Sequence, residues 1–320
     1  MQGKRFISGV QCTGKLHIGN ILSVVFPTIE IAKHNDTLVF LADLHTLTTI
    51  KDKKQLHDNI LHNTAVWLAC GMIDIDNIIL YRQSRIKGIC ELMWWLNCLT
   101  PYPMLANAHA FKDKSKNLSD VNIGLFDYPI LMAADILIMK ADYVIVGQDQ
   151  KQHIEITRDI AKKFNSTYGD ILTIPKEYIH ENIGLIHGTD GRKMSKSYNN
   201  TIDIFATEEE LHNKIFSMKT DSKSFSEQKD PKECNVFRVY SIIAEKCDVL
   251  AMEEKYINGK IGYKEAKEVL LDTILTKYKP LRERFNNLIV DKKYLNAILE
   301  RGEKNAQKIT EEVKNFIVVE

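Results

Sequence analysis

The sequence predicts an α/β fold with a parallel sheet, followed by an all-helical C-terminal region. In the first two thirds, short apolar runs alternate with amphipathic stretches, which is typical of strands that are connected by helices. After about residue 204, apolar residues recur at helical spacing instead. A chain of 320 residues is long enough for two domains, so we expect a boundary between residues 1–204 and 205–320.

The apolar runs predict four strands, at residues 5–10, 37–42, 77–81 and 143–146. Helices are expected between the first three strands, over residues 16–33 and 56–70. Gly71 is a stop signal for the second of these helices. In the last third, a capping box at residues 207–210 precedes helices that are predicted over residues 237–256, 263–288 and 292–318. Pro280 predicts a kink in the middle one of these three.

Composition excludes several classes of protein. The formal net charge is +1, so any nucleic-acid surface must be a local patch. No apolar run approaches the roughly 18–20 residues of a membrane span, and the N-terminus does not resemble a signal peptide. The six cysteines form no C-x-x-C pair, so we expect free buried thiols in a reducing cytoplasm and no metal site.

The first motif follows the first predicted strand. Residues 9–15 match the phosphate-binding pattern G-x-x-x-x-G-K, but Leu16 stands where a hydroxyl must bind Mg²⁺, which argues against a P-loop. The next four residues are His17-Ile-Gly-Asn20, at the start of a helix. His17 and Asn20 share a helix face and could donate hydrogen bonds to phosphate, while Gly19 permits close approach of a nucleotide. A solvated helix start is the alternative interpretation.

The second motif is Lys193-Met-Ser-Lys-Ser197, in a polar segment. Two lysines three residues apart can stabilise the charge of a polyphosphate. An ordinary solvated loop is the alternative.

A third feature is an apolar helical segment, residues 128–140, that contains Asp135. Pro129 is expected in the first turn of this helix. A buried carboxylate needs a donor, which Lys140 or the backbone could supply. The functional alternative is that Asp135 accepts a hydrogen bond from a ligand N–H, such as that of an indole.

Together these motifs resemble those of a known family. Residues 17–20 and 193–197 are similar to the HIGH and KMSKS signatures of class I aminoacyl-tRNA synthetases. Five further segments resemble tryptophanyl-tRNA synthetases of bacterial type, at residues 8–11, 43–45, 111–115, 128–137 and 144–155.

The resemblance implies a Rossmann-like catalytic domain over residues 1–204 and a helical anticodon-recognition domain over residues 205–320. An insertion at about residues 101–140 would mediate homodimerisation. Such an enzyme activates tryptophan with ATP to give tryptophanyl-adenylate and pyrophosphate. It then transfers tryptophan to the 3′ terminal adenosine of tRNA(Trp). The expected partners are therefore ATP with Mg²⁺, L-tryptophan, tRNA(Trp) and a second copy of the chain, in the cytoplasm and without a membrane.

The resemblance also implies roles for individual residues. The expected catalytic side chains are those of His17, Asn20, Lys114, Lys193 and Lys196. ATP would be bound by Gln11, Gly19, Asn20, Gly147, Asp149, Lys193, Met194, Ser195 and Lys196. Tryptophan would be bound by Asp135 at the indole N–H, and by Met132, Tyr128, Gln150, His45, Val144 and Val146. His153 is expected to be structural.

The sequence departs from the family pattern at two positions. Cys12 replaces the usual proline of the first loop, which would make the enzyme sensitive to oxidation if this thiol is exposed. Asn20 replaces the final His of the class signature.

Three other functions are alternatives to this interpretation. They are a tyrosyl-tRNA synthetase, another class I-like nucleotidyltransferase and a non-catalytic RNA-binding paralogue.

Overall fold

The computed structural model describes residues 3–107, 122–180 and 186–317. The chain forms two compact units. We name them the sheet unit (residues 1–14, 24–180 and 291–320) and the helical unit (residues 15–23 and 181–290). These units group the chain by packing, whereas the predicted boundary near residue 204 concerns functional domains and stays a prediction.

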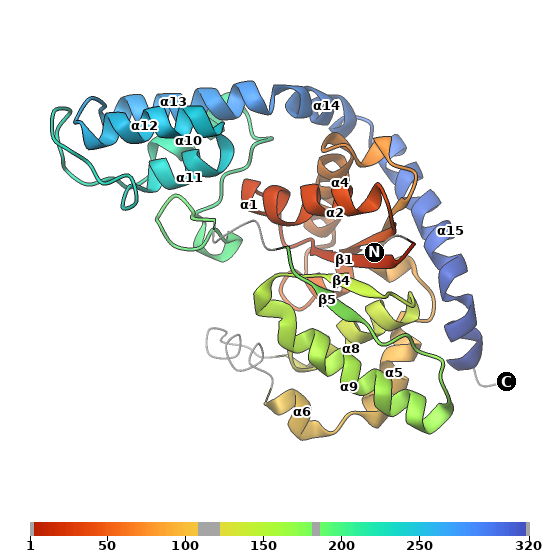
Figure 1. Cartoon of the computed structure of the whole chain (residues 1–320). Helices are drawn as coiled ribbons and strands as arrows, with labels where there is room; N and C mark the ends of the chain where they lie inside the picture. Colours follow the sequence, from red (N-terminus) through yellow and green to blue (C-terminus); the bar gives the residue numbers. More distant parts are fainter. Residues whose placement is uncertain (1–2, 108–121, 181–185, 318–320) are drawn as a thin grey trace. The chain divides into compact units, whose positions relative to one another are not determined.

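The sheet unit contains five parallel strands in the order β3-β2-β1-β4-β5. Strands β1, β4 and β5 are labelled in Figure 1. They are β1 (Arg5–Gln11), β2 (Asp36–Ala42), β3 (Ile78–Arg82), β4 (Tyr143–Ile145) and β5 (Lys176–Tyr178). The four predicted strands are confirmed, with each end within one residue of its expected place. Strand β5 was not predicted, because its three residues Lys-Glu-Tyr carry no apolar run.

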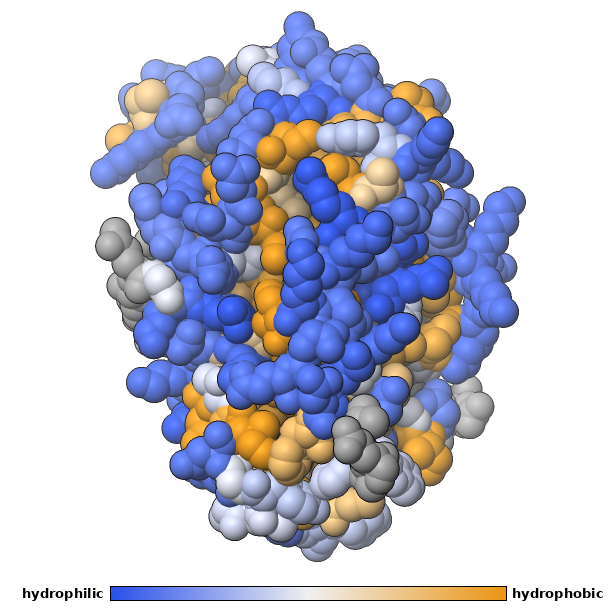
Figure 2. Space-filling view, turned by 90° about the vertical axis from the view of Figure 1, so that its right-hand side faces the viewer, coloured by the Kyte–Doolittle hydropathy of each residue, from blue (hydrophilic) through white to orange (hydrophobic). Residues whose placement is uncertain are grey.

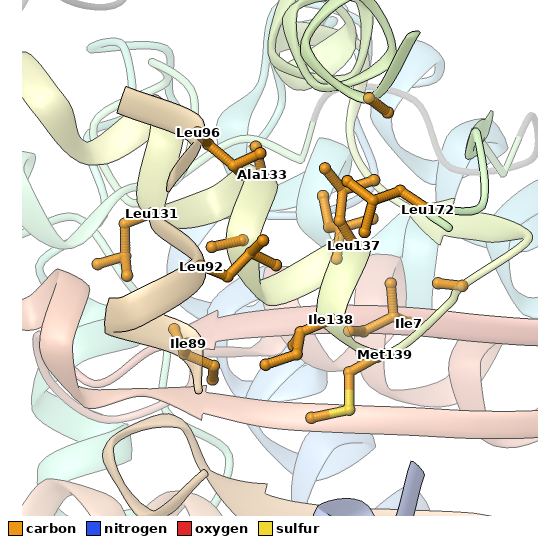
Figure 3. Close-up of a cluster of buried hydrophobic side chains, with 14 of the residues drawn as sticks. Ile7, Ile89, Leu92, Leu96, Leu131, Ala133, Leu137, Ile138, Met139 and Leu172 are labelled. Atoms are coloured by element: carbon orange, nitrogen blue, oxygen red, sulfur yellow. The ribbon is translucent and has the colours of Figure 1, made fainter. Parts of the chain in front are cut away.

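Both faces of the central strands are buried. On β1, the neighbouring side chains of Phe6 and Ile7 point to opposite faces, and both are at most 1% exposed. Ile7 belongs to a core formed with three helices, α5 (Ile89–Leu99), α8 (Ile123–Ile138) and α9 (Lys151–Tyr168). In Figure 3, Leu92 of α5 and Leu137 of α8 lie in this cluster. Burial on both faces explains why the parallel strands are continuous apolar runs.

Helix α8 begins earlier than the sequence predicted. Asn122 caps it, because its side-chain oxygen accepts a hydrogen bond from the Leu125 N–H at 3.0 Å. Pro129 therefore lies inside the helix, and its expected place in the first turn is wrong. A proline fixes a helical φ and removes one N–H, so a well-packed helix can contain it at the loss of one hydrogen bond.

The two helices that were predicted between the first three strands have different outcomes, and the first of them is divided. Residues 16–33 form α1 (Ile18–Asn20), a π-helical turn (Ile21–Val25) and α2 (Phe26–Ala32). By contrast, α4 (Lys53–Ala69) is a single helix, capped by the Asp52 side chain on the Gln55 N–H at 2.8 Å. It confirms the helix that was expected to end before Gly71.

The C-terminal helix α15 (Lys292–Ile317) packs along the edge strand β3. Its buried residues recur every three or four positions: Leu295, Leu299, Gly302, Ala306, Thr310, Val313 and Ile317. Its outer side is polar, and the face of the molecule in Figure 2 is mostly hydrophilic. Arg82 at the end of β3 forms a largely buried ion pair with Glu303 of α15.

Replacing Gly302 with alanine is expected to lower the free energy of unfolding by about 3 kcal/mol. A Cβ at this position would lie 1.9 Å from the backbone oxygen of Leu80, so α15 would have to move away from β3. Urea unfolding measures the effect, with Asn305→Ala on the exposed side of α15 as the matched control. Equal stability of the two variants would contradict the close approach.

The helical unit confirms the predicted capping box, since Thr207 and Glu210 exchange hydrogen bonds at the start of α10. Besides the short α1, it contains α10 (Glu208–Phe216), α11 (Asn235–Ile243), α12 (Lys246–Ile257), α13 (Tyr263–Lys277) and α14 (Lys279–Ile289). The continuous helix predicted over residues 237–256 is wrong, because the backbone is extended at Ala244. At Pro280 the expected kink is a full break, and this proline lies in the first turn of α14.

None of the six cysteines, all of which the structure describes, forms a disulfide, but only three are buried, Cys12, Cys70 and Cys234. Cys12 is 0% exposed, so the condition for the oxidation hypothesis is not met. Among the described residues, no helix has the length and apolar character that crossing a membrane requires.

Candidate active site

The Asp135 carboxylate lies inside the sheet unit and is 1% exposed. The Gln83 amide nitrogen donates to both of its oxygens, at 2.9 and 2.8 Å, and His45 Nε2 lies 2.9 Å from Oδ2. Burial raises the pKa of Asp135, and the contacts with His45 and Gln83 oppose that rise. Lys140 pairs instead with Glu312 at 2.6 Å, so the alternative of an Asp135–Lys140 ion pair is wrong.

Three of the predicted tryptophan-binding residues share one side of α8. Tyr128, Met132 and Asp135 are spaced four and three residues apart, which places them on the same helix face. The Tyr128 hydroxyl lies 2.7 Å from Nε2 of His153, which is 2% exposed, as expected for a structural histidine. Burial, together with the charge of Asp149, raises the pKa of Tyr128 to about 12, so this hydroxyl stays neutral.

The carboxyl ends of β1 and β4 are adjacent, and here the strand order reverses. Open parallel sheets bind ligands at such a point. Gln11 ends β1 and is exposed. After β4, Gly147 precedes the turn Gln148–Gln150, in which the Gln150 amide donates to Asp149 at 3.0 Å.

Val144 and Val146 belong to β4 and the residue after it. Val144 is 3% exposed and lies in the hydrophobic core, and Val146 packs against that core. The structure therefore places both side chains in apolar surroundings, and their contact with an indole ring stays a prediction.

In the helical unit, His17 caps α1. The ring nitrogen Nδ1 of His17 accepts a hydrogen bond from the backbone N–H of Asn20 at 3.4 Å. The backbone N–H of His17 donates to the side-chain oxygen of Asn20 at 3.3 Å. Burial, with a smaller effect of the Lys196 charge, lowers the pKa of His17 to about 4. The neutral ring therefore carries its proton on Nε2, because Nδ1 is the acceptor, and Nε2 is available to donate to an anion.

The low pKa of His17 has a measurable consequence. Its pKa is about 4 in the folded chain and about 6.5 when unfolded, so the unfolded state binds more protons between these values. Stability contributed by neutral His17 is thus complete above pH 6.5 and falls as the pH drops toward 4. We expect wild type to lose up to about 3 kcal/mol relative to His17→Asn over this window, measured by urea unfolding. Parallel pH profiles of the two proteins would contradict this assignment.

The two signature motifs meet in the helical unit. A Cβ on Gly19 would lie 2.9 Å from His17 Nδ1 and 3.5 Å from the sulfur of Met194, so glycine leaves room for both side chains. Lys196 is close enough to His17 for its charge to lower the histidine pKa. This contact between motifs about 175 residues apart agrees with one phosphate-handling site.

Asn200 holds the second signature in place. This residue is 1% exposed, its side-chain oxygen accepts from the Ser195 N–H at 2.8 Å, and its amide donates to the Lys193 carbonyl at 3.0 Å. The same amide donates to Asp190 at 2.7 Å. Lys193 itself is exposed. The loop thus has an anchored backbone and an accessible cation.

Sequence reasoning missed two of these residues, Gln83 and Asn200. Asn200 lies just after the second signature, so that a polar side chain at that spacing was an available signal. No sequence signal pointed to Gln83, because its hydrogen-bond partners are about 40 and 50 residues away in the chain. Lys114 and the segment at residues 111–115 lie outside the described residues.

A chain that combines a parallel sheet of Rossmann order with both signatures, and whose two signatures lie close together, has the combination that defines class I aminoacyl-tRNA synthetases. The model of the family tRNA synthetases class I (W and Y) matches residues 2–279, and the chain belongs to this family.

Its relatives narrow the assignment within that family. The chain is 38% identical to the tryptophan–tRNA ligase of Campylobacter jejuni (strain RM1221), over 96% of both proteins. It is also 38% identical to the tryptophan–tRNA ligase of Fusobacterium nucleatum subsp. nucleatum, over 96% of this chain and 94% of that protein. The crystal structure of Campylobacter jejuni tryptophanyl-tRNA synthetase complexed with ADP and tryptophan is similar at a TM-score of 0.91, with 37% identity and 98% of each chain covered.

Proposed function

We propose that this chain acts as a tryptophan–tRNA ligase. It activates tryptophan with ATP and transfers the tryptophanyl group to the 3′ terminal adenosine of tRNA(Trp). The observation that carries the proposal is the buried Asp135 carboxylate, which is held by His45 and Gln83 as a hydrogen-bond acceptor. An ionised carboxylate can only accept, and an indole N–H can only donate. The names of the relatives support the same amino acid.

Tryptophan binds on the face of α8 that carries Asp135, with the indole N–H donated to the carboxylate. Met132 packs the ring, and Val144, Val146 and His45 line the rest of the pocket. Tyr128 and Gln150 bind the α-amino group. Gln150 is partly exposed and follows the carboxyl end of β4, which supports its role, because ligands enter open sheets at that edge.

ATP binds through the two signatures. His17 and Asn20 donate to the α-phosphate, and Gly19 permits close approach of the adenine. Lys193, Lys196, Ser195 and Lys114 hold the pyrophosphate, and Met194 binds ATP from the same loop. Gly147 and Asp149 contact the ribose side, and Gln11 lies beside the nucleotide and the amino-acid carboxylate. Mg²⁺ arrives with ATP as part of the substrate. The relative solved with ADP and tryptophan supports an adenine nucleotide here.

The chemistry needs no covalent enzyme intermediate. A carboxylate oxygen of tryptophan attacks the α-phosphorus, the bond to the bridging oxygen breaks and pyrophosphate leaves. A ribose hydroxyl of the terminal adenosine then attacks the activated carbonyl and releases AMP. Both reactants of the first step are anions, so positioning and the nearby cations Lys193 and Lys196 lower the barrier.

The remaining assignments concern partners. Residues 205–320 recognise the anticodon of tRNA(Trp), residues 1–204 carry the catalytic site, and the enzyme acts in the cytoplasm as a homodimer. Large exposed apolar side chains support pairing through the segment near residues 101–140, because Tyr102 is 72% and Ile123 77% exposed. In the homodimer, the second copy of the chain is expected to cover these side chains.

Amino-acid-dependent exchange of pyrophosphate into ATP tests this proposal, with tryptophan, tyrosine and no amino acid in parallel. Exchange with tryptophan alone supports it. Exchange with tyrosine keeps the class and overturns the role of Asp135. No exchange from folded protein favours the non-catalytic RNA-binding paralogue.

A further inference from the structure

Gln83 lies immediately after β3, in the short turn Gln83–Arg85, and is 0% exposed. Its side-chain oxygen accepts from the backbone N–H groups of Leu44 at 3.0 Å and His45 at 3.3 Å. Its amide nitrogen faces the two oxygens of Asp135. Because the backbone donors require an acceptor, the amide cannot flip, and its donor always points at the carboxylate.

The hydrogen bonds that Asp135 accepts can be compared with the number that its carboxylate is able to accept. A carboxylate offers about four acceptor positions, two on each oxygen. Gln83 and His45 occupy both positions on Oδ2, and Gln83 occupies one on Oδ1. One position on Oδ1 is left, which matches the single N–H of an indole ring.

We propose that Gln83 is a positioning residue for amino-acid recognition, which holds the Asp135 carboxylate so that one acceptor position on Oδ1 is left for the indole N–H. This inference rests on the proposed function and deepens it. Gln83 acts through Asp135 and not on the substrate.

The position of Gln83 is itself fixed from two sides. The preceding residue, Arg82, is tied to Glu303 of α15 in a largely buried ion pair. The following residue, Ser84, donates its N–H to Asp43 at 2.9 Å, and Asp43 belongs to the same short helix as His45, α3 (Asp43–Thr46). A loose surface turn would not be restrained in this way.

Gln83→Glu tests the proposal through pH. The second oxygen of the new carboxylate would lie about where the amide nitrogen is now, 2.8–2.9 Å from Asp135, and two carboxylates at that distance cannot both be ionised. At low pH the shared proton would reproduce the donor of Gln83. At higher pH the proton is lost, the two groups repel each other and the acceptor moves.

The expected result is a tryptophan KM near the wild-type value at pH 6, which rises about tenfold or more by pH 9. The KM for ATP and kcat in pyrophosphate exchange should stay within about twofold of wild type. The other titratable groups whose charges couple to Asp135 are His45 and Asp43 of α3, Tyr81 of β3 and Cys90 of α5. They are unchanged in the variant, so wild type controls for them, and Gln55→Glu on the exposed face of α4 controls for the added charge.

An analogue in which sulfur replaces the indole N–H separates positioning from general damage. Its inhibition constant should be the same at pH 6 and pH 9 in Gln83→Glu, because it donates nothing to Asp135. If Gln83→Glu does not fold, Gln83→Asn keeps the amide but is too short to bridge. It should raise the tryptophan KM about tenfold at every pH.

A tryptophan KM in Gln83→Glu that is independent of pH and equal to wild type would overturn the inference. So would equal losses for tryptophan, ATP and the analogue, since these indicate a structural role. Failure of the proposed function would appear separately, as wild-type protein that shows no tryptophan-dependent exchange.

Discussion

Replacing Lys196 with alanine is expected to slow formation of tryptophanyl-adenylate by about 100- to 1000-fold, the range seen when one preorganised donor to a developing charge is removed. The ammonium group lies near His17, where it already depresses the histidine pKa. Its effect should be largest when negative charge builds up between the α- and β-phosphates. Tryptophan binding without ATP should change little. Single-turnover kinetics and equilibrium binding measure the two quantities separately.

Lys219→Ala is the matched control, because Lys219 is an exposed lysine of the same helical unit outside the signature loop. It should keep wild-type rates. Equal losses of adenylate formation and tryptophan affinity in Lys196→Ala would indicate that this lysine stabilises the structure only.

Asp135→Asn is expected to preserve the fold but weaken tryptophan binding about tenfold to 100-fold, which corresponds to loss of a hydrogen bond to a charged group. The amide nitrogen of asparagine would face the Gln83 donor or the substrate N–H, and neither can accept from it. Selectivity against phenylalanine and tyrosine should fall as well, since the new amide also offers a donor.

Competition binding with the three amino acids measures both effects. Asp159→Asn is the control, because this carboxylate is exposed on α9. Unchanged discrimination in Asp135→Asn would refute the assigned role of Asp135, whatever the change in stability.

The sequence could predict the sheet because burial on both faces makes each central strand a continuous apolar run, as in Thr37–Ala42. It could not predict β5, whose residues are polar. The sequence also could not predict which element α15 packs against. Its apolar stripe indicates a helix that packs, but the stripe is the same whether the helix packs on its own region or, as here, along β3.

The candidate site likewise has parts that the sequence could predict and parts that it could not. The signatures could be found because their spacing within a few residues is distinctive, and the structure adds that Gly19 and Met194 lie against each other. The environment of Asp135 could not be found. Its nearest charged residue in sequence, Lys140, is engaged elsewhere, and its actual partners come from two other elements of the fold. Contacts of that kind depend on strand order, which local patterns do not contain.

The central claim is tested most directly by charging a tRNA(Trp) transcript with radiolabelled amino acid in the presence of ATP and Mg²⁺. The account predicts that tryptophan is attached to tRNA(Trp), that tyrosine is not, and that a tRNA(Tyr) transcript accepts neither. Charging with tyrosine, or tryptophan-dependent pyrophosphate exchange without any transfer to tRNA(Trp), would contradict it.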